Sequence, residues 1–441
     1  GEQLALNSSA TTQTSEGNIG SGDNKYVENN VGILAQSGQR AGIIPSEDLG
    51  AKVSATESFS YVDKDPVHAL YVNDIDVTFG KYSKGNIMIA SERGTQVDVA
   101  MPTNSHTEGK NGIALRTDAI VDYNKNHASY TNDNKIISST QDSSNEAAIG
   151  TIIAYSEGTW DPKKNDLMSE ATKNKLKGKE SEINIGRPVI LSAKADVTNN
   201  GELESRPIAY VASNKGIITA ENETEAKGFG SIIGYAESGG SITATGKVTA
   251  VDAWVAGDSA SQKQTYKNIG GYAKGTGSKV TFKGGADING LGALANGSGA
   301  TVTLDTASNT IKSGKEGALV AVDGGEVVFK GGTIENKDLS YEANSHDNVT
   351  PFSAKGNNSK IKFEGATTIN MYDGILVAGE ESDYEATVTG TKKYQGTGNV
   401  TVNLKKDGVN LGIFKGINAT WDGNSGAYLN TLKTVPKFAA I

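Results

Sequence analysis

Lys279-Val280-Thr281-Phe282 is a four-residue segment whose second and fourth residues are large and apolar. The pattern returns three times, after turns rich in Gly, Ser or Asn, in Thr301-Val302-Thr303-Leu304, Glu326-Val327-Val328-Phe329 and Lys360-Ile361-Lys362-Phe363. Alternation with a period of two is typical of a strand that buries one of its faces. The recurrence of such strands at a regular spacing predicts a solenoid.

The repeat is a little over twenty residues long. Phe282 and Leu304 are 22 residues apart, Leu304 and Phe329 are 25 apart, and the interval of 34 to Phe363 contains a polar insertion at 336–349. A second apolar residue follows each strand (Ile288, Ile311, Ile334, Ile369), and a third apolar segment follows that (Ala293-Leu294, Ala318-Leu319, Phe352, Ile375-Leu376). Three short strands per coil predict an all-β chain folded as a right-handed parallel β-helix. The Leu-rich consensus of leucine-rich repeats and the longer period of propeller blades are absent.

Fainter copies of the strand pattern extend the prediction over most of the chain. Ile75–Phe79 and Gln96–Val99 stand 20 residues apart, and further copies lie near residues 183, 217, 242 and 400. We expect an irregular N-terminal cap at 1–30, a β-helix over 31–415, and a C-terminal coil or the start of a further repeat at 416–441. Polar insertions are expected at 102–147, 157–182, 336–349 and 379–397. Insertions of a solenoid often form its binding surface.

The insertion at 157–182 also carries a helical signal. Asn165 is a suitable N-cap, and Leu167, Met168, Ala171 and Leu176 follow at spacings that favour one face of a short helix. We expect that face to lie against the wall of the solenoid.

Composition limits the function classes. The chain has 54 Gly, no Cys, a net charge of −9 and only 36% apolar side chains, which suits the narrow core of a solenoid better than a large globular core. The pI of about 5.2 is far below that of a typical nucleic-acid-binding domain, so no nucleic-acid partner is expected. The absence of Cys suits a bacterial chain that crosses the periplasm. No stretch has the length and apolarity of a membrane-spanning helix, and the start at Gly1-Glu2 reads as a mature segment or fragment.

The motifs of common enzymes and cofactor sites are missing from the sequence. There is no thiol nucleophile, the four His residues are scattered, and neither an HExxH motif, a GxSxG motif nor a phosphate-binding glycine loop occurs. We therefore expect no enzymatic activity, no cofactor and no metal centre.

Two groups of residues are candidates for binding. Glu380, Glu381 and Asp383 form an acidic cluster in the insertion at 379–397, which would suit a cationic ligand or a divalent ion, or be simply a solvated loop. Trp160, Tyr123 and Tyr130 lie in polar segments. An exposed Trp or Tyr there would stack on a sugar ring or anchor a protein partner, and the alternative is local packing.

The phrases Gly270-Gly271-Tyr272-Ala273, Gly275–Phe282, Gly365–Asn370 and Gly374-Ile375-Leu376-Val377 resemble the passenger repeats of large type V autotransporter adhesins. The Lys- and Asn-rich, Cys-free style is most similar to the giant outer-membrane adhesins of fusobacteria. The resemblance covers residues 205–415 well. It is one of repeat style, without a catalytic or ligand signature, so it assigns no role to any residue.

This resemblance implies a β-helix displayed on the bacterial cell surface that mediates coaggregation or attachment to host cells. The partner would be a protein or glycan receptor, and attachment to the outer membrane would come only from a C-terminal barrel, whose strand pattern is not seen after Val400. Two alternatives stay open. One is a β-helical enzyme that processes polysaccharides, which predicts carboxylates on stacked coils. The other is a structural spacer or self-association segment.

Overall fold

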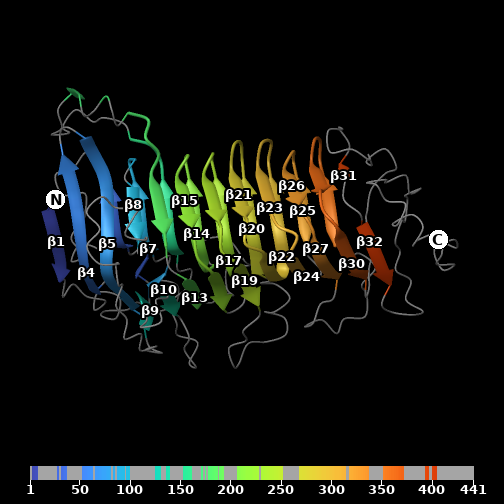
Figure 1. Ribbon diagram of the computed structural model, residues 1–441, viewed down its shortest axis with the longest axis horizontal. Coiled ribbons are helices and arrows are strands. Elements are labelled where there is room, and N and C mark those ends of the chain that lie inside the picture. The colour runs from blue at the N-terminus through green and yellow to red at the C-terminus, as the bar shows by residue number, and fades with distance from the viewer. Residues whose placement is uncertain are drawn as a thin grey trace. The chain divides into compact units, whose positions relative to one another are not determined.

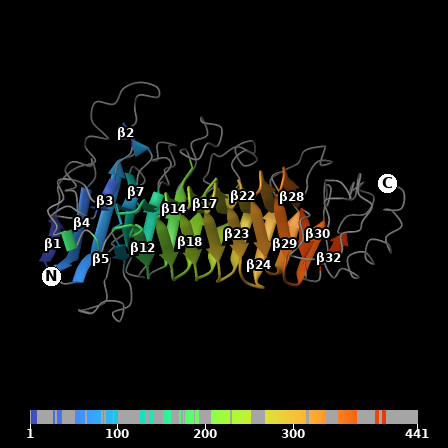
Figure 2. The same ribbon diagram turned by 90° about the horizontal axis from the view of Figure 1, so that it is seen from above.

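The structure is a computed structural model. It describes residues 2–7, 27–28, 31–36, 52–62, 65–80, 83–84, 87–94, 96–99, 125–130, 136–139, 152–160, 170–171, 174, 177–186, 188–192, 206–227, 230–251, 268–313, 317–336, 351–371, 393–396 and 400–404. The chain forms two compact units, unit 1 (Gly1–Thr245 with Ala253–Gly257) and unit 2 (Gly246–Asp252 with Asp258–Ile441). Each unit is a stack of short parallel strands, which confirms the predicted parallel β-helix (Figures 1 and 2).

In unit 1 each complete coil contributes one strand to each of three parallel sheets. The first sheet contains β3 (Val31–Gln36), β7 (Ile87–Glu92), β11 (Ile152–Glu157), β14 (Ile208–Ser213) and β17 (Ile232–Glu237). The second contains β8 (Gln96–Val99), β12 (Glu182–Ile185), β15 (Ile217–Ala220) and β18 (Ser241–Ala244). The third contains β10 (Ile136–Ser139), β13 (Val189–Ser192) and β16 (Thr224–Lys227).

The N-terminal part of unit 1 departs from this parallel scheme. β1 (Glu2–Asn7) pairs antiparallel with β4 (Lys52–Val62), and β4 pairs antiparallel with the long strand β5 (Asp65–Gly80). One part of β5 pairs parallel with β8, and its end pairs antiparallel with β9 (Lys125–Tyr130), which in turn pairs antiparallel with β10. A separate two-stranded ribbon joins β2 (Val27–Glu28) and β6 (Ser83–Lys84).

This arrangement corrects the register expected near the N-terminus. The strand pattern at Ile75–Phe79 was predicted to be the coil before Gln96–Val99, but β8 pairs with Ala69, Leu70, Tyr71 and Val72 instead. Residues 76–80 lie against β9. Strands also occupy 2–7, 125–130 and 136–139, inside ranges expected to be an irregular cap and an insertion. Antiparallel pairing does not require a constant repeat length, so spacing alone misplaced these strands.

Unit 2 has the same three-sheet plan. Its first sheet contains β20 (Asn268–Lys274), the second half of β22 (Ala286–Asn296), β25 (Leu319–Val322) and β28 (Phe352–Lys355). The second contains β21 (Lys279–Phe282), β23 (Thr301–Leu304), β26 (Glu326–Phe329), β29 (Lys360–Phe363) and β31 (Tyr394–Gly396). The third contains β19 (Val248–Val251), the first half of β22, β24 (Asn309–Ser313), β27 (Gly332–Asn336), β30 (Thr367–Met371) and β32 (Val400–Leu404).

The core of unit 2 consists of columns in which equivalent residues of successive coils lie in register. The strands that decided the fold contribute two fully buried columns, Val280–Val302–Val327–Ile361 and Phe282–Leu304–Phe329–Phe363. The predicted second anchors form a third buried column, Ile288–Ile311–Ile334–Ile369. Burial of each such side chain stabilises the fold by roughly 1.5–3 kcal/mol. Since each column is continuous, every coil depends on its two neighbours.

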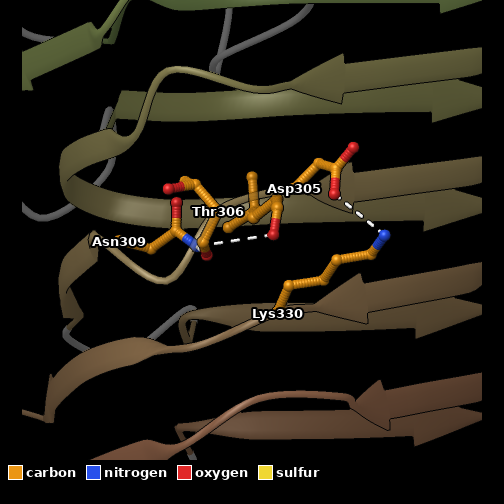
Figure 3. Close-up of polar contacts among 5 residues, drawn as sticks. Asp305, Thr306, Asn309 and Lys330 are labelled. Atoms are coloured by element: carbon orange, nitrogen blue, oxygen red, sulfur yellow. Dashed lines mark hydrogen bonds and ion pairs between the residues drawn. The ribbon is translucent and has the colours of Figure 1, made fainter.

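The corner between β23 and β24 is held by one buried side chain, Asn309 (Figure 3). Its Nδ2 donates to the carbonyl oxygen of Thr306 in its own coil at 2.8 Å and to that of Gly331 in the next coil at 2.9 Å. Its Oδ1 accepts the N–H of Ala286 in the preceding coil at 3.2 Å. Asn309 therefore links three successive coils. Gly332 lies opposite Asn309, where a Cβ would come within 2.0 Å of the Asn309 carbonyl oxygen, and its φ of +127° also favours glycine.

A salt bridge crosses the same corner on the outside. Lys330 Nζ lies 2.8 Å from Asp305 Oδ1, and the hydrogen bond to Asp305 raises the pKa of Lys330. Both side chains are more than 30% exposed, so this pair adds at most about 1 kcal/mol. The buried amide of Asn309 is the stronger link between the coils.

We predict that Asn309→Ala lowers the free energy of unfolding of unit 2 by about 2–4 kcal/mol, because the substitution removes the three hydrogen bonds above and a longer one at 3.4 Å to the carbonyl oxygen of Leu304, and leaves buried backbone groups unsatisfied. Chemical denaturation followed by circular dichroism measures this loss. Asn357→Ala is the matched control, since Asn357 is exposed in a turn, and its effect should stay within about 0.5 kcal/mol. Equal effects of the two substitutions would contradict the role given to Asn309.

Candidate functional site

The site lies in unit 1, at the corner where the strands of the first sheet end, and we call it the acidic corner. The register of β7, β11, β14 and β17 places Glu92, Glu157, Ser213 and Glu237 in one column, and Tyr155, Val211 and Tyr235 in the column beside it. Between the two columns runs a fully buried one, Ser91–Ser156–Ala212–Ala236. Because side chains alternate along a strand, the Tyr and Glu columns lie on the outer face of the sheet.

Each tyrosine of the acidic corner donates to the glutamate two residues further along its own strand. Tyr155 Oη lies 2.8 Å from Glu157 Oε2, and Tyr235 Oη lies 2.7 Å from Glu237 Oε2. The other oxygen of each carboxylate also accepts a hydrogen bond, from Asn214 Nδ2 to Glu157 at 3.0 Å and from Ser213 Oγ to Glu237 at 3.1 Å. Neutral donors thus fix both carboxylates against the sheet.

The column of glutamates places side chains of like charge opposite one another on neighbouring strands. Glu92 and Glu157 are direct cross-strand partners, an arrangement that destabilises a sheet. Unit 2 does the opposite at comparable positions, where Glu326 faces Lys360 and Lys312 faces Glu335. A local conflict of this kind is more common at functional sites than in structural parts of a protein. The acidic corner can accept hydrogen bonds from, and attract, a cationic or hydroxyl-rich ligand.

The insertion that follows β11 leaves the solenoid through an ordered stem at this corner. Trp160 N–H donates to the carbonyl oxygen of Lys179 at 2.7 Å, and Gly178 N–H donates back to that of Trp160 at 3.0 Å. Ser181 N–H donates to the carbonyl oxygen of Gly158 at 2.8 Å, and Thr159 forms an antiparallel bridge with Glu180. The stem is therefore a short β-ribbon of residues 158–160 and 178–181.

Trp160 anchors the stem. Its side chain is only 1% exposed and lies beside Gly94, where a Cβ would come within 2.6 Å of the Trp160 Cβ. Gly94 N–H donates to Ser181 Oγ at 2.8 Å, and Ser181 Oγ donates to the carbonyl oxygen of Glu157. Among the residues that the structure describes, the indole Nε1 has no hydrogen-bond partner. Of the two alternatives for Trp160, the structure bears out local packing and not an exposed indole that stacks on a ligand.

The other predicted binding residues are not brought to this corner. Tyr130 is the last residue of β9, and its side chain lies outside the described residues. Tyr123, Glu380, Glu381 and Asp383 also lie outside them. Glu170, Ala171 and Asn174 are helical, which confirms the helix predicted in the insertion, but Ala171 is exposed and does not face the solenoid wall.

Sequence reasoning missed the tyrosines and glutamates of the acidic corner. The signal was present as a repeated motif, Tyr155-Ser156-Glu157 and Tyr235-Ala236-Glu237, each preceded by an Ile pair two residues before the Tyr. The two copies are 80 residues apart. Only the coil register shows that one strand, β14, separates them.

Among the described residues, no group of three or more His, Cys, Asp or Glu is arranged to hold a metal ion. No helix in the described part of the chain has the length and apolarity needed to cross a membrane.

Comparison with models of protein families found no match. Searches among curated proteins and among solved structures likewise found no significant match.

Tyr155 makes the stability of this corner sensitive to alkaline pH. Burial, the hydrogen bond to Glu157, and the charges of Glu157, Glu92 and Glu237 all raise the pKa of Tyr155 above its usual value of about 10. The folded protein therefore holds this proton more tightly than the unfolded chain, so stability is full below about pH 10 and falls as the pH rises above it.

We predict that Tyr155→Phe makes the loss of stability above pH 10 less steep, because a group that must stay protonated in the folded state is removed. Thermal melts at intervals between pH 9 and pH 12 measure the slope for both proteins. Tyr210→Phe is a useful second variant, since burial alone raises the pKa of Tyr210, against the effect of its hydrogen bond to Thr224. Parallel curves for wild type and Tyr155→Phe would show that Tyr155 is not coupled to folding.

Proposed function

We propose that this chain is part of the passenger of a bacterial surface adhesin, in which a β-helical shaft presents insertions to a receptor. It has no enzymatic activity in this proposal, binds no nucleic acid, and is exposed outside the cell. Its partner is a protein or glycan on a host cell or on another bacterium. The passenger-like repeat style of residues 205–415 supports the proposal from the side of the sequence.

One structural observation supports it most directly, namely the stem of the insertion at 157–182. The solenoid uses a buried Trp, a glycine gap and paired backbone hydrogen bonds to fix this stem to its corner. Beyond the stem the described residues Glu170, Ala171, Asn174 and Lys177 are all exposed. A fixed base beneath an exposed insertion is typical of a binding loop carried by a rigid scaffold.

We predict that replacing residues 161–176 by a short Gly-Ser linker, with Trp160 and residues 177–181 retained, abolishes adhesion of beads coated with the purified chain. The bead assay uses host cells and partner bacteria as targets, and circular dichroism confirms that the β-structure is unchanged. The control is the same linker in place of residues 337–350, which should adhere like the wild type. Undiminished adhesion after the first replacement would reject this insertion as the recognition element.

A polysaccharide-processing enzyme is the second candidate, favoured by the acidic corner. Glu92 and Glu157 lie on adjacent strands and Glu157 and Glu237 on strands two apart, so their backbones are separated by roughly 5 and 10 Å. Glycoside hydrolases use pairs of carboxyl groups roughly 5–9.5 Å apart, a separation that side chains on backbones at these distances can reach. If this candidate is right, the chain releases reducing sugar or unsaturated ends from acidic polysaccharides, and Glu157→Gln lowers that rate by at least about a hundredfold. Adhesion without such release favours the adhesin.

A further inference from the structure

The outer face of the first sheet in unit 2 carries apolar side chains where a soluble β-helix would be expected to carry polar ones. The inner column of this sheet is Ala273–Ala295–Ala321–Ala354, buried throughout. On either side of it, the outward columns are Tyr272–Leu294–Val320–Ser353 and Lys274–Asn296–Val322–Lys355. We call these eight residues the lysine-edged strip.

The strip is accessible in part. Leu294, Val320 and Val322 are partly exposed, and Lys274 and Lys355 are exposed at its two ends. The outward residues of the neighbouring second sheet are mostly polar, as in Lys279, Thr281, Thr301 and Thr303. The apolar character therefore belongs to this face and is not a general feature of the unit. A contiguous exposed apolar surface with a polar edge is characteristic of an interaction site.

The two lysines at the ends of the strip favour a partner that carries acidic residues. Lys274 and Lys355 lie in the same column, three strand-to-strand steps apart, so they are about 14 Å from one another along the stack. Two and a half to three turns of an α-helix cover the same length. A helix laid along the strip would set apolar residues at i, i+4 and i+7 on Tyr272, Leu294 and Val320, and carboxylates on its flank would reach the two lysines.

We propose that the lysine-edged strip is a docking surface for an amphipathic helix with acidic flanking residues, supplied by a partner protein. This surface is separate from the insertion at 157–182 and gives the shaft itself a recognition role. A second copy of the chain docking strip to strip is disfavoured, because it would bring four lysines together. An anionic membrane is disfavoured as well, because two lysines contribute only about 1 kcal/mol each and the strip carries neither Trp nor Phe to enter the lipid interface.

The test uses the whole chain and two fluorescent 18-residue helical peptides. One peptide carries Leu at i, i+4, i+7 and i+11 with Glu on both flanks, and the other carries Lys in place of Glu. Fluorescence anisotropy should show binding of the acidic peptide, weakened by added salt, and no binding of the basic one. The double charge reversal Lys274→Glu with Lys355→Glu should weaken binding about tenfold or more. Leu294→Thr with Val320→Thr should abolish binding, while keeping residue types that strands accept.

The matched control is Lys247→Glu with Lys279→Glu, which reverses two exposed lysines of unit 2 outside the strip and should change affinity by less than twofold. The chain with residues 161–176 replaced should bind the acidic peptide unchanged, which separates this proposal from the adhesin proposal. Equal binding of both peptides, or an equal effect of the control pair, would overturn the proposal. So would strip-dependent dimerisation in sedimentation experiments, or strip-dependent binding to vesicles of phosphatidylcholine and phosphatidylserine.

Discussion

The in-register ladder of backbone hydrogen bonds between successive coils is the constraint on which the rest of each unit depends. Bonds such as Thr301 N–H to the carbonyl oxygen of Ser278, and Glu326 N–H to that of Ala300, join neighbouring coils at 2.9 Å. Once two coils are joined in this way, every side chain lies directly above its counterpart. Each residue is therefore stacked between the residues that occupy the same position in the coils before and after its own. The packing of a residue is for this reason set by the column to which it belongs.

Charged side chains are arranged differently in the outer columns of the two units. In unit 2, Lys362 Nζ lies 3.1 Å from Glu326 Oε1, so charges of opposite sign meet between neighbouring coils. In unit 1 the acidic corner stacks like charges and uses tyrosine hydroxyls to fix them. The first arrangement supports stacking, whereas like charges directly opposite one another on neighbouring strands disfavour it. The stacked glutamates distinguish the candidate site in unit 1 from the ion-paired outer columns of unit 2.

The sequence was sufficient to predict the fold where the repeat is regular. Val280, Phe282 and Ile288 and their equivalents occupy the buried columns that their spacing indicated, because apolar alternation and turn glycines act locally. It was insufficient near the N-terminus, where β5 bends from parallel pairing with β8 to antiparallel pairing with β9. The burial of Trp160 could not be read from its polar neighbours in sequence, which do not show that Gly94, 66 residues earlier, leaves space for its backbone and Cβ. The acidic corner was missed since its members are close only through coil register.

The stacked architecture has a mechanical consequence. The hydrogen bonds between coils run along the stacking direction, so a pull along that direction separates one coil from the next. Phe282 and Leu304 are 22 residues apart, and a coil of that length released from its neighbour extends to roughly 70 Å in place of the 5 Å it occupies in the stack. Asn309, bonded to the coils before and after its own, would resist this separation locally. We therefore expect unit 2 to lengthen under tension as its coils separate from the stack one after another.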